Sequence, residues 1–461
     1  MNSDIRVLSA EPYFIETVAR TPLKFGGVVM DAATYAQVRV EVETQGGRRG
    51  AGWGGMFLAD FWAFPDDRVP HDQRLAGMKE MTRRYCRLVA DYNQSGHPID
   101  LYHQTEEGLR VLADEVSGSL KLAVPLPFLA ALVSASPVDA AVHDAFGIAN
   151  GISTYDGYGP EFMDHDLSRY LGPQFKGRYV ADYVRESYRA EVPVFHLVGG
   201  LDKVRKSELD DSDPKDGLPN SLDEWIERDG LFCLKVKLRG NDLEWDIART
   251  IEVARIAREV RARIGEHKLY FSADTNEMCD HPDYIVEYLQ RVKERDPQAY
   301  DEILYVEQPT ERDLAARRLD MRPIARLKPV LVDESLTGLG DMDLALELGW
   351  SGIALKACKC QSAEMVMAAR AEQLSVPYSI QDLTNPALAL LHSAGLGARL
   401  NPIMGVEANS PQFFPSASEP EAAVHPGLFR RREGVLVAGT LKGPGLGYQM
   451  EKIDRRLPDP W

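Results

Sequence analysis

The segment GLFCLKVKLRG, from Gly230 to Gly240, decides the fold because it combines a buried strand with two lysines. Its apolar residues indicate a strand inside a sheet that is covered on both faces. Side chains two positions apart in a strand point to the same face, so Lys235 and Lys237 are directed to one place. Buried ammonium groups are costly unless other groups compensate for their charge. The reason for these two cations has to be found elsewhere in the chain.

Apolar runs of strand length follow one another from about residue 190, with amphipathic helical patterns between them. In DIARTIEVARIAREVRARIG, residues Ile247, Ile251, Ala254 and Ala257 share one helix face, and Gly265 ends the pattern. Eight such runs with at least six helices indicate a parallel sheet covered by helices. We expect a closed (β/α) barrel, with a doubly wound open sheet as the alternative. The runs are VPVFHLVG near 192, FCLKVKL near 232, KLYFSADTN near 268, EILYVEQP near 302, PVLVDES near 329, GIALKAC near 352, VPYSIQD near 376 and ARLNPI near 398.

The region before the barrel, and one segment inside it, have different patterns. In AQVRVEVETQGGRRGAGWG, Val38, Val40 and Val42 alternate with polar residues, which predicts a half-exposed antiparallel sheet. Helical patterns follow this sheet. The charged segment 202–222, after the first barrel strand, is either a solvated surface insertion or a lid over the catalytic face, and the sequence leaves both readings open.

Composition excludes several classes of function. The net charge of −17, from 70 acidic and 53 basic residues, argues against nucleic acid or an anionic membrane as a partner. The 5 cysteines are scattered and form no zinc-binding pattern, which suits a reduced compartment. The start has no secretory signal pattern, and no uncharged apolar run approaches the roughly 18 residues that cross a bilayer. We therefore expect a cytoplasmic protein.

Acidic residues end three successive strands of the predicted barrel. Asp274 ends the third strand, with Asn276 on the same face, Glu307 ends the fourth, and Asp333 the fifth. An acid after a strand is often only a helix N-cap, but three at neighbouring strand ends would repel one another without a cation. Hard cations such as Mg²⁺ bind such oxygen ligands and keep positions open for a substrate. The spacing therefore predicts a metal site of Asp274, Glu307 and Asp333.

Lysines flank this acidic set on the second and sixth strands. Lys237, beside Lys235 and a dication, is expected to be neutral often enough to act as a general base. Lys356, in LKACK, approaches from the opposite side of the barrel mouth. A carboxylate substrate between these two lysines has a base on each face of its α-carbon, and the metal stabilises the enediolate that forms. The alternative, that the KVK lysines extend to solvent, does not account for the acids.

The ordered set KVK, SADTN, VEQP, VDES and LKACK resembles the enolase superfamily, and is most similar to its mandelate racemase/muconate lactonizing enzyme family. Within that family it resembles the muconate-lactonizing-enzyme subgroup, with its dipeptide epimerases and N-acylamino-acid racemases. The resemblance implies a modified TIM barrel with an α+β capping domain. The domains implied are a cap at 1–150, a linker or insertion at 151–190, the barrel at 191–405, and a segment at 406–461 that returns to the cap.

The same resemblance implies roles for single residues. Asp274, Glu307 and Asp333 would bind Mg²⁺, or Mn²⁺ in its place, and Lys237 and Lys356 would be the two acid/base catalysts. Lys235 would tune Lys237 and contact the substrate carboxylate, and Glu334 would pair with a lysine behind the metal ligands. Asn276, Asp382 and Glu407 are candidates for substrate contact, although a loop or cap role for Glu407 stays open. Specificity is expected in the loops around 25–30 and 52–64, and near 381–384 and 404–409.

The chain also departs from the family pattern. GWGG stands where the family has GWGE, Cys360 and Gln361 replace a frequent glycine pair, and the seventh strand ends in Gln381-Asp382 without a histidine. The last departure favours lysine–lysine chemistry.

We expect a Mg²⁺-dependent racemase or epimerase that acts on a small carboxylate and forms a homo-oligomer. A cycloisomerase or an acid dehydratase would use the same half-reaction. A barrel that only binds or scaffolds is the alternative of another class.

Overall fold

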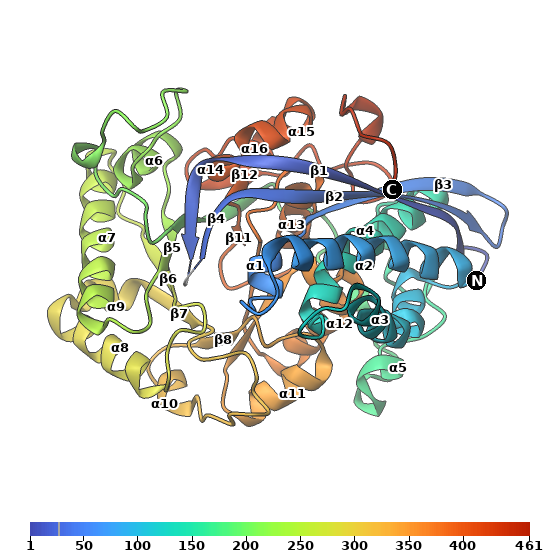
Figure 1. Ribbon diagram of the computed structural model, residues 1–461, viewed down its shortest axis with the longest axis horizontal. Coiled ribbons are helices and arrows are strands. Elements are labelled where there is room, and N and C mark those ends of the chain that lie inside the picture. Colours follow the sequence, from blue (N-terminus) through green and yellow to red (C-terminus); the bar gives the residue numbers. More distant parts are fainter. Residues whose placement is uncertain (26–27) are drawn as a thin grey trace.

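Eight parallel strands form a closed barrel in the computed structural model, which describes residues 1–25 and 28–461 (Figure 1). Each strand pairs with the next, and the last pairs with the first, through Val406 opposite Val194. This closure confirms the barrel and rules out the open sheet. The strands are β4 (Glu191–Val198), β5 (Cys233–Lys237), β6 (Tyr270–Asp274), β7 (Ile303–Glu307), β8 (Val330–Val332), β9 (Gly352–Lys356), β10 (Tyr378–Gln381) and β11 (Val406–Glu407).

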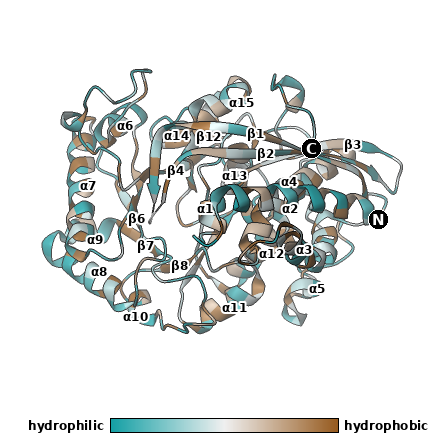
Figure 2. Cartoon of the chain, in the orientation of Figure 1, coloured by the Kyte–Doolittle hydropathy of each residue, from teal (hydrophilic) through white to brown (hydrophobic). Residues whose placement is uncertain are grey.

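Helices surround the barrel, and the visible sides of α7 and α8 are largely hydrophilic (Figure 2). The predicted helix is α7 (Leu243–Arg263), in which Asp242 caps the start by accepting from the Trp245 amide. Ile247, Ala254 and Ala257 are fully buried on its inner face, as their spacing predicts, whereas Ile251 on the same predicted face is only partly buried. The other barrel helices are α6 (Leu222–Asp229), α8 (Asp283–Arg295), α9 (Pro297–Glu302), α10 (Arg322–Ala325), α11 (Leu339–Glu347), α12 (Gln361–Leu374) and α13 (Ala387–Arg399).

The eighth strand differs from the sequence prediction. ARLNPI was expected to form it, but α13 continues to Arg399 and the strand is β11, so Glu407 lies within the strand. Gly405 explains the placement, because a Cβ at this position would lie 1.9 Å from the carbonyl oxygen of Pro193 on β4. Only a glycine allows the two backbones to approach this closely just before the strand closes the barrel.

The N-terminal region forms a three-stranded antiparallel sheet that caps the barrel (Figure 1). Val38, Val40 and Val42 are buried, which confirms the predicted alternation. Gly55, where the family has an acid, lies against Tyr35, and a Cβ there would be 1.8 Å from the phenolic oxygen. The departure from GWGE is therefore matched by packing against Tyr35. The elements are β1 (Ile5–Phe25), β2 (Val28–Thr44), β3 (Arg49–Phe57), α1 (Asp60–Ala63), α2 (His71–Asp91), α3 (Pro98–Leu120) and α4 (Phe128–Asn150).

The linker and the C-terminal region contain only short elements. The last residues return to the cap, where the Trp461 amide donates to the Pro12 carbonyl at 3.0 Å and the two rings of Phe14 and Trp461 are 5.4 Å apart. The short helices and last strand are α5 (Ser168–Leu171), α14 (Ser410–Phe413), α15 (Glu419–Val424), α16 (Pro426–Phe429) and β12 (Val435–Val437), and the 3-10 turns are η1 (Thr154–Gly157), η2 (Pro173–Phe175), η3 (Val180–Tyr183), η4 (Lys206–Glu208), η5 (Ala357–Lys359), η6 (Pro415–Ser418) and η7 (Met450–Lys452).

A buried polar seam joins the cap helix α4 to the barrel helix α12. The hydroxyl of Ser362 on α12 donates to Asp139 on α4 at 2.7 Å, and Nε2 of His143 lies 2.8 Å from the same hydroxyl. Tyr158, in the linker, bonds both His143 and Gln361. All of these side chains are buried, so their hydrogen bonds replace those that water would make.

The long β1–β2 ribbon reaches over the barrel mouth and contacts the charged insertion. Arg20 has a side chain only 7% exposed, and its guanidinium bonds Asp216, Asn220 and the carbonyls of Leu218 and Pro219. The Gly200 amide donates to the carbonyl of Lys24 near the ribbon tip. Gly26 and Gly27, within the loop expected to set specificity, lie outside the described residues. The insertion is therefore bound to the cap and is not a free surface loop.

Among the described residues, no helix combines the length and the apolar character that crossing a membrane requires.

Candidate active site

The strand register brings the predicted site residues together at one end of the barrel. Lys237 on β5 is opposite Asp274 on β6, and Asp274 is opposite Glu307 on β7. Lys356 ends β9, which is four strands from β5 in either direction around the closed barrel. Lys237 and Lys356 therefore stand on opposite walls of the mouth.

Each of the three predicted metal ligands is fully buried and is paired with a lysine. Lys237 donates to Oδ2 of Asp274, the ammonium of Lys235 lies 2.8 Å from Oε1 of Glu307, and that of Lys356 lies 2.7 Å from Oδ2 of Asp333. Burial opposes ionisation of Asp274, but the charges of Lys237 and Lys235 prevail and lower its pKa to about 2. The carboxylates thus interact with the cations that the chain itself supplies.

The pKa of Glu307 shifts in the opposite direction to that of Asp274. Burial, followed by the charge of neighbouring Asp274, holds its pKa well above the usual range, although Lys235 lies beside it. The mouth also contains Asp333, Glu334, Asp382 and Glu407, so carboxylates outnumber the lysines around it. The described side chains around the mouth therefore include more acidic than basic groups.

The donor set fits a hard divalent cation. Within residues 1–25 and 28–461, no three His, Cys, Asp or Glu side chains are already arranged around a metal position, because lysine ammonium groups lie between the carboxylates. Carboxylate oxygens from three neighbouring strands are nevertheless the ligands that Mg²⁺ prefers. Two further buried oxygens at the mouth, Oδ1 of Asn276 and Oε2 of Glu334, have no hydrogen-bond partner. Asp274, Glu307 and Asp333 would hold such an ion.

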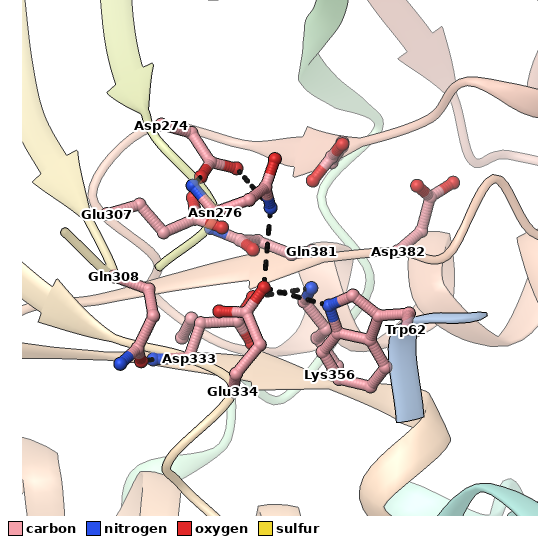
Figure 3. A network of polar contacts seen from close by, with 12 residues as sticks. Trp62, Asp274, Asn276, Glu307, Gln308, Asp333, Glu334, Lys356, Gln381 and Asp382 are labelled. Carbon is pink, nitrogen blue, oxygen red and sulfur yellow. Dashed lines mark hydrogen bonds and ion pairs between the residues drawn. The ribbon is translucent and has the colours of Figure 1, made fainter. Parts of the chain in front are cut away.

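Glu334 was expected to pair with a lysine, and that expectation is wrong. Its Oε1 accepts from Nε1 of Trp62 at 2.9 Å and from the amide of Asn276 at 3.3 Å, because Lys356 pairs with the adjacent Asp333 (Figure 3). Burial, followed by the charge of Asp333, raises the pKa of Glu334 to about 7. Asn276 also connects Glu334 to Asp274, through its own backbone amide at 2.8 Å.

The remaining two candidates lie on the last two strands. Glu407 contacts Lys235 at 3.1 Å and accepts from Asn409 at 2.6 Å. Asp382 accepts from the amides of Thr384 and Asn409, and burial, followed by the charge of Glu407, raises its pKa to about 8. Both carboxylates line the central cavity, where a substrate would meet them.

This cavity has a volume of only about 40 Å³. Its polar lining includes Lys235, Lys237, Lys356 and Asn276, beside the two carboxylates just described. The cap covers it with apolar side chains, from Leu23 and Met30 on the ribbon to Ala59, Phe61 and Trp62. All three lysines of the sequence prediction therefore line the same cavity.

Loops after several barrel strands have left-handed backbone at residues other than glycine. The φ angles are 45° at Asn276, 67° at Glu277, 29° at Gln308, 73° at Cys360 and 63° at Thr384. Such conformations cost energy and concentrate at functional sites. Cys360 stands where the family has glycine and retains a glycine-like backbone.

No role was predicted from the sequence for Lys359, and Gln381 and Trp62 were included only within the ranges expected to set specificity. Lys359 donates to the carbonyl of Asp333 at 2.7 Å and to its Oδ1 at 3.1 Å, although it was quoted only as part of LKACK. The side-chain amide of Gln381 bonds Glu307, and Trp62 covers Lys356. The signal for Lys359 was its distance of three residues from Lys356, whereas the contact of Trp62 with Lys356 depends on how the cap packs on the barrel.

Comparison with known proteins agrees with this geometry. Residues 218–454, more than half of the chain, match the family model described as enolase C-terminal domain-like. No curated protein matches the chain by sequence.

Solved structures share the fold at low identity. The dipeptide epimerase from Enterococcus faecalis V583, complexed with Mg and L-Leu-L-Tyr, is 17% identical, with a TM-score of 0.55 over 88% of this chain and 91% of that chain. Muconate lactonizing enzyme from Pseudomonas fluorescens, complexed with muconolactone, is 16% identical, with a TM-score of 0.57 over 96% of both chains. N-succinyl Arg/Lys racemase from Bacillus cereus ATCC 14579 is 15% identical, with a TM-score of 0.59 over 98% of both chains.

Proposed function

The chain belongs to the enolase superfamily, and from that premise we propose that it removes the α-proton of a small carboxylate substrate in a Mg²⁺-dependent reaction. The observation that carries the proposal is the placement of Lys237 and Lys356 on opposite walls of the barrel, above three buried carboxylates. Bound Mg²⁺, or Mn²⁺, would supply positive charge that stabilises an enediolate. Asp274, Glu307 and Asp333 would hold the ion.

The lysines give the chain a proton carrier on each face of the substrate's α-carbon. One lysine removes the proton, and the other returns a proton to the opposite face, which inverts the stereocentre. Racemisation or epimerisation is therefore the outcome we propose. The structurally similar dipeptide epimerase and N-succinyl Arg/Lys racemase support this choice, while the similar lactonizing enzyme keeps a cycloisomerase as the second candidate. An acid dehydratase would also begin with the same proton abstraction.

The test is exchange of the α-proton in D₂O with Mg²⁺, for both enantiomers of dipeptides, N-acylamino acids and sugar acids. We expect deuterium at the α-carbon of at least one class, with inversion. Lys356→Ala should abolish exchange from one enantiomer and Lys237→Ala from the other, because each lysine serves one face. Lys215→Ala, at an exposed lysine in the insertion, is the matched control and should leave both rates unchanged.

Three results would count against the proposal. Absence of exchange across all classes would favour a barrel that only binds or scaffolds. Equal exchange in the wild type and both lysine variants would remove the assigned roles. Exchange without inversion, followed by a lactone or an elimination product, would replace the racemase with the cycloisomerase or the dehydratase. The homo-oligomeric state and the cytoplasmic location stay predictions of the sequence.

A further inference from the structure

Trp62 on the cap is in direct contact with the catalytic side of the barrel. It belongs to the short helix α1, and its side chain is 5% exposed. The ammonium of Lys356 lies 4.4 Å from the centre of the indole ring, which is within the range of a cation–π interaction. The indole Nε1 donates to Glu334 at 2.9 Å, which fixes the plane of the ring (Figure 3).

The backbone of Trp62 is also held by the barrel. Arg312, in the loop after β7, donates from Nη1 to the carbonyl oxygen of Trp62 at 3.0 Å. The same guanidinium bonds Glu277 through Nε at 2.8 Å and through Nη2. Two barrel loops therefore determine where α1 rests, and the indole is not placed by the cap alone.

Trp62 lies between two cavities. The central cavity of about 40 Å³ and an outer cavity of about 450 Å³ share Phe61, Trp62 and Asn276 as lining residues. The central cavity is much smaller than the outer one, and α1 forms part of the wall between them. Displacement of α1 would connect the two cavities, and it would remove the indole from Lys356 at the same time.

We propose that Trp62 is a positioning residue for Lys356, so that one of the two catalytic lysines is oriented only when α1 rests on the barrel. The inference rests on the proposed function. With α1 seated, the indole face covers the ammonium on one side while Asp333 holds it on the other. The lysine is then limited to the orientation that faces the cavity. With α1 displaced, the ammonium loses the indole, retains its contact with Asp333 and becomes accessible to water.

The test measures proton abstraction from each face of the α-carbon separately. Exchange of the α-proton in D₂O is followed from each enantiomer, and Lys356→Ala identifies the enantiomer whose proton Lys356 removes. Trp62→Leu keeps an apolar side chain but has no ring, so we expect the Lys356-dependent rate to fall about tenfold. Trp62→Phe keeps a ring but loses the N–H donor, so the Lys356-dependent rate should fall less in this variant. The rate from the other enantiomer should change less than the Lys356-dependent rate in both variants.

Trp461→Phe is the matched control, because Trp461 packs against Phe14 on the cap sheet, outside the ranges expected to contact substrate, and should leave both rates unchanged. An equal fall from both enantiomers would show a merely structural role for Trp62, and no fall would remove the role altogether. Either result overturns the inference.

A second measurement separates this inference from the proposed function, since it needs no substrate. The amine of Lys356 is labelled with an amine-reactive reagent and read by mass spectrometry in the wild type, Trp62→Phe and Trp62→Ala. We expect labelling of Lys356 to rise several-fold in Trp62→Ala and less in Trp62→Phe. Unchanged labelling would overturn the inference even if the enzyme is a racemase. A rise in labelling without exchange of any acid would contradict the proposed function alone.

Discussion

Lys235 illustrates how a lysine becomes stable inside a barrel. Its side chain is 2% exposed, and its ammonium lies between 2.8 and 3.1 Å from carboxylates of Asp274, Glu307 and Glu407. Burial disfavours its charge, but these three acids prevail and hold its pKa well above the usual range. Lys235 is therefore a permanent cation that links strands β5, β6, β7 and β11. A buried ion of this kind stabilises the fold only while all its partners remain.

Lys359 gives the clearest prediction at this scale. Its side chain is 1% exposed, and its ammonium bonds both the carbonyl and the carboxylate of Asp333. Lys359→Met leaves Asp333 with Lys356 alone and removes a buried partner, so we expect the free energy of unfolding to fall by about 3 to 5 kcal/mol. Urea unfolding followed by circular dichroism measures it. Lys215→Met, at a side chain 76% exposed, should cost less than about 1 kcal/mol, and equal losses in both variants would contradict the prediction.

At the scale of elements, the β1–β2 ribbon and the charged insertion act as one unit. Arg20 connects them, because its guanidinium bonds two side chains and two carbonyls between residues 216 and 220. The insertion has few apolar contacts of its own, since most of its residues from 205 to 217 are exposed. The ribbon in turn places Leu23 and Met30 over the central cavity. The position of the insertion is thus linked to the lining of the site.

Loss of this connection should appear as local mobility. Arg20→Ala leaves the insertion without its main anchor, so we expect trypsin to cleave after Lys206 or Lys215 several times faster than in the wild type. The unfolding midpoint should change little, because the core is not altered. Arg39→Ala, at a half-buried arginine whose partner Glu41 is on the same strand, is the control. Cleavage at the wild-type rate in Arg20→Ala would show that the insertion is held by other contacts.

At the scale of the whole molecule, the proposed metal ligands come from two strands of the closed barrel and from the loop after a third. An ion bound by Asp274, Glu307 and Asp333 would connect β6 and β7 to the loop after β8. Binding to the folded state alone stabilises it against unfolding. The positive charge of the ion would then offset the charge of Asp274, which together with burial raises the pKa of Glu307.

We therefore expect Mg²⁺ to stabilise the fold by about 2.7 kcal/mol at 100 times its dissociation constant. Thermal unfolding with Mg²⁺, with Mn²⁺ and with a chelator measures the effect. Glu307→Gln and Asp333→Asn should lose it, whereas Asp211→Asn, in the exposed insertion, should keep it. Retention of the full shift in Glu307→Gln would show that the ion binds elsewhere.

The barrel and most of its site could be predicted from the sequence. The reason is that the carboxyl ends of parallel strands meet on one face of the barrel, irrespective of loop conformation. Asp274, Glu307 and Lys356 follow from that rule. The eighth strand was misplaced because it has two residues, too few for a pattern, and depends on the close approach at Gly405. The loop that contains Trp62 was expected to contact substrate, but its bond to Glu334 could not be predicted, because the two residues are 272 positions apart in the chain and meet only when the cap packs on the barrel.

The polar seam between α4 and α12 limits how this molecule can be divided. Asp139 and His143 have Ser362 as a hydrogen-bond partner, so a cap made without the barrel would expose an acid, an imidazole and the apolar face around them. A barrel made alone would leave Ser362 and Gln361 in the same condition. Exchange of caps between relatives, as a way to change the substrate, would therefore have to transfer matching residues of α12 together with α4. The cap and the barrel would therefore have to be changed together, although they look like two domains.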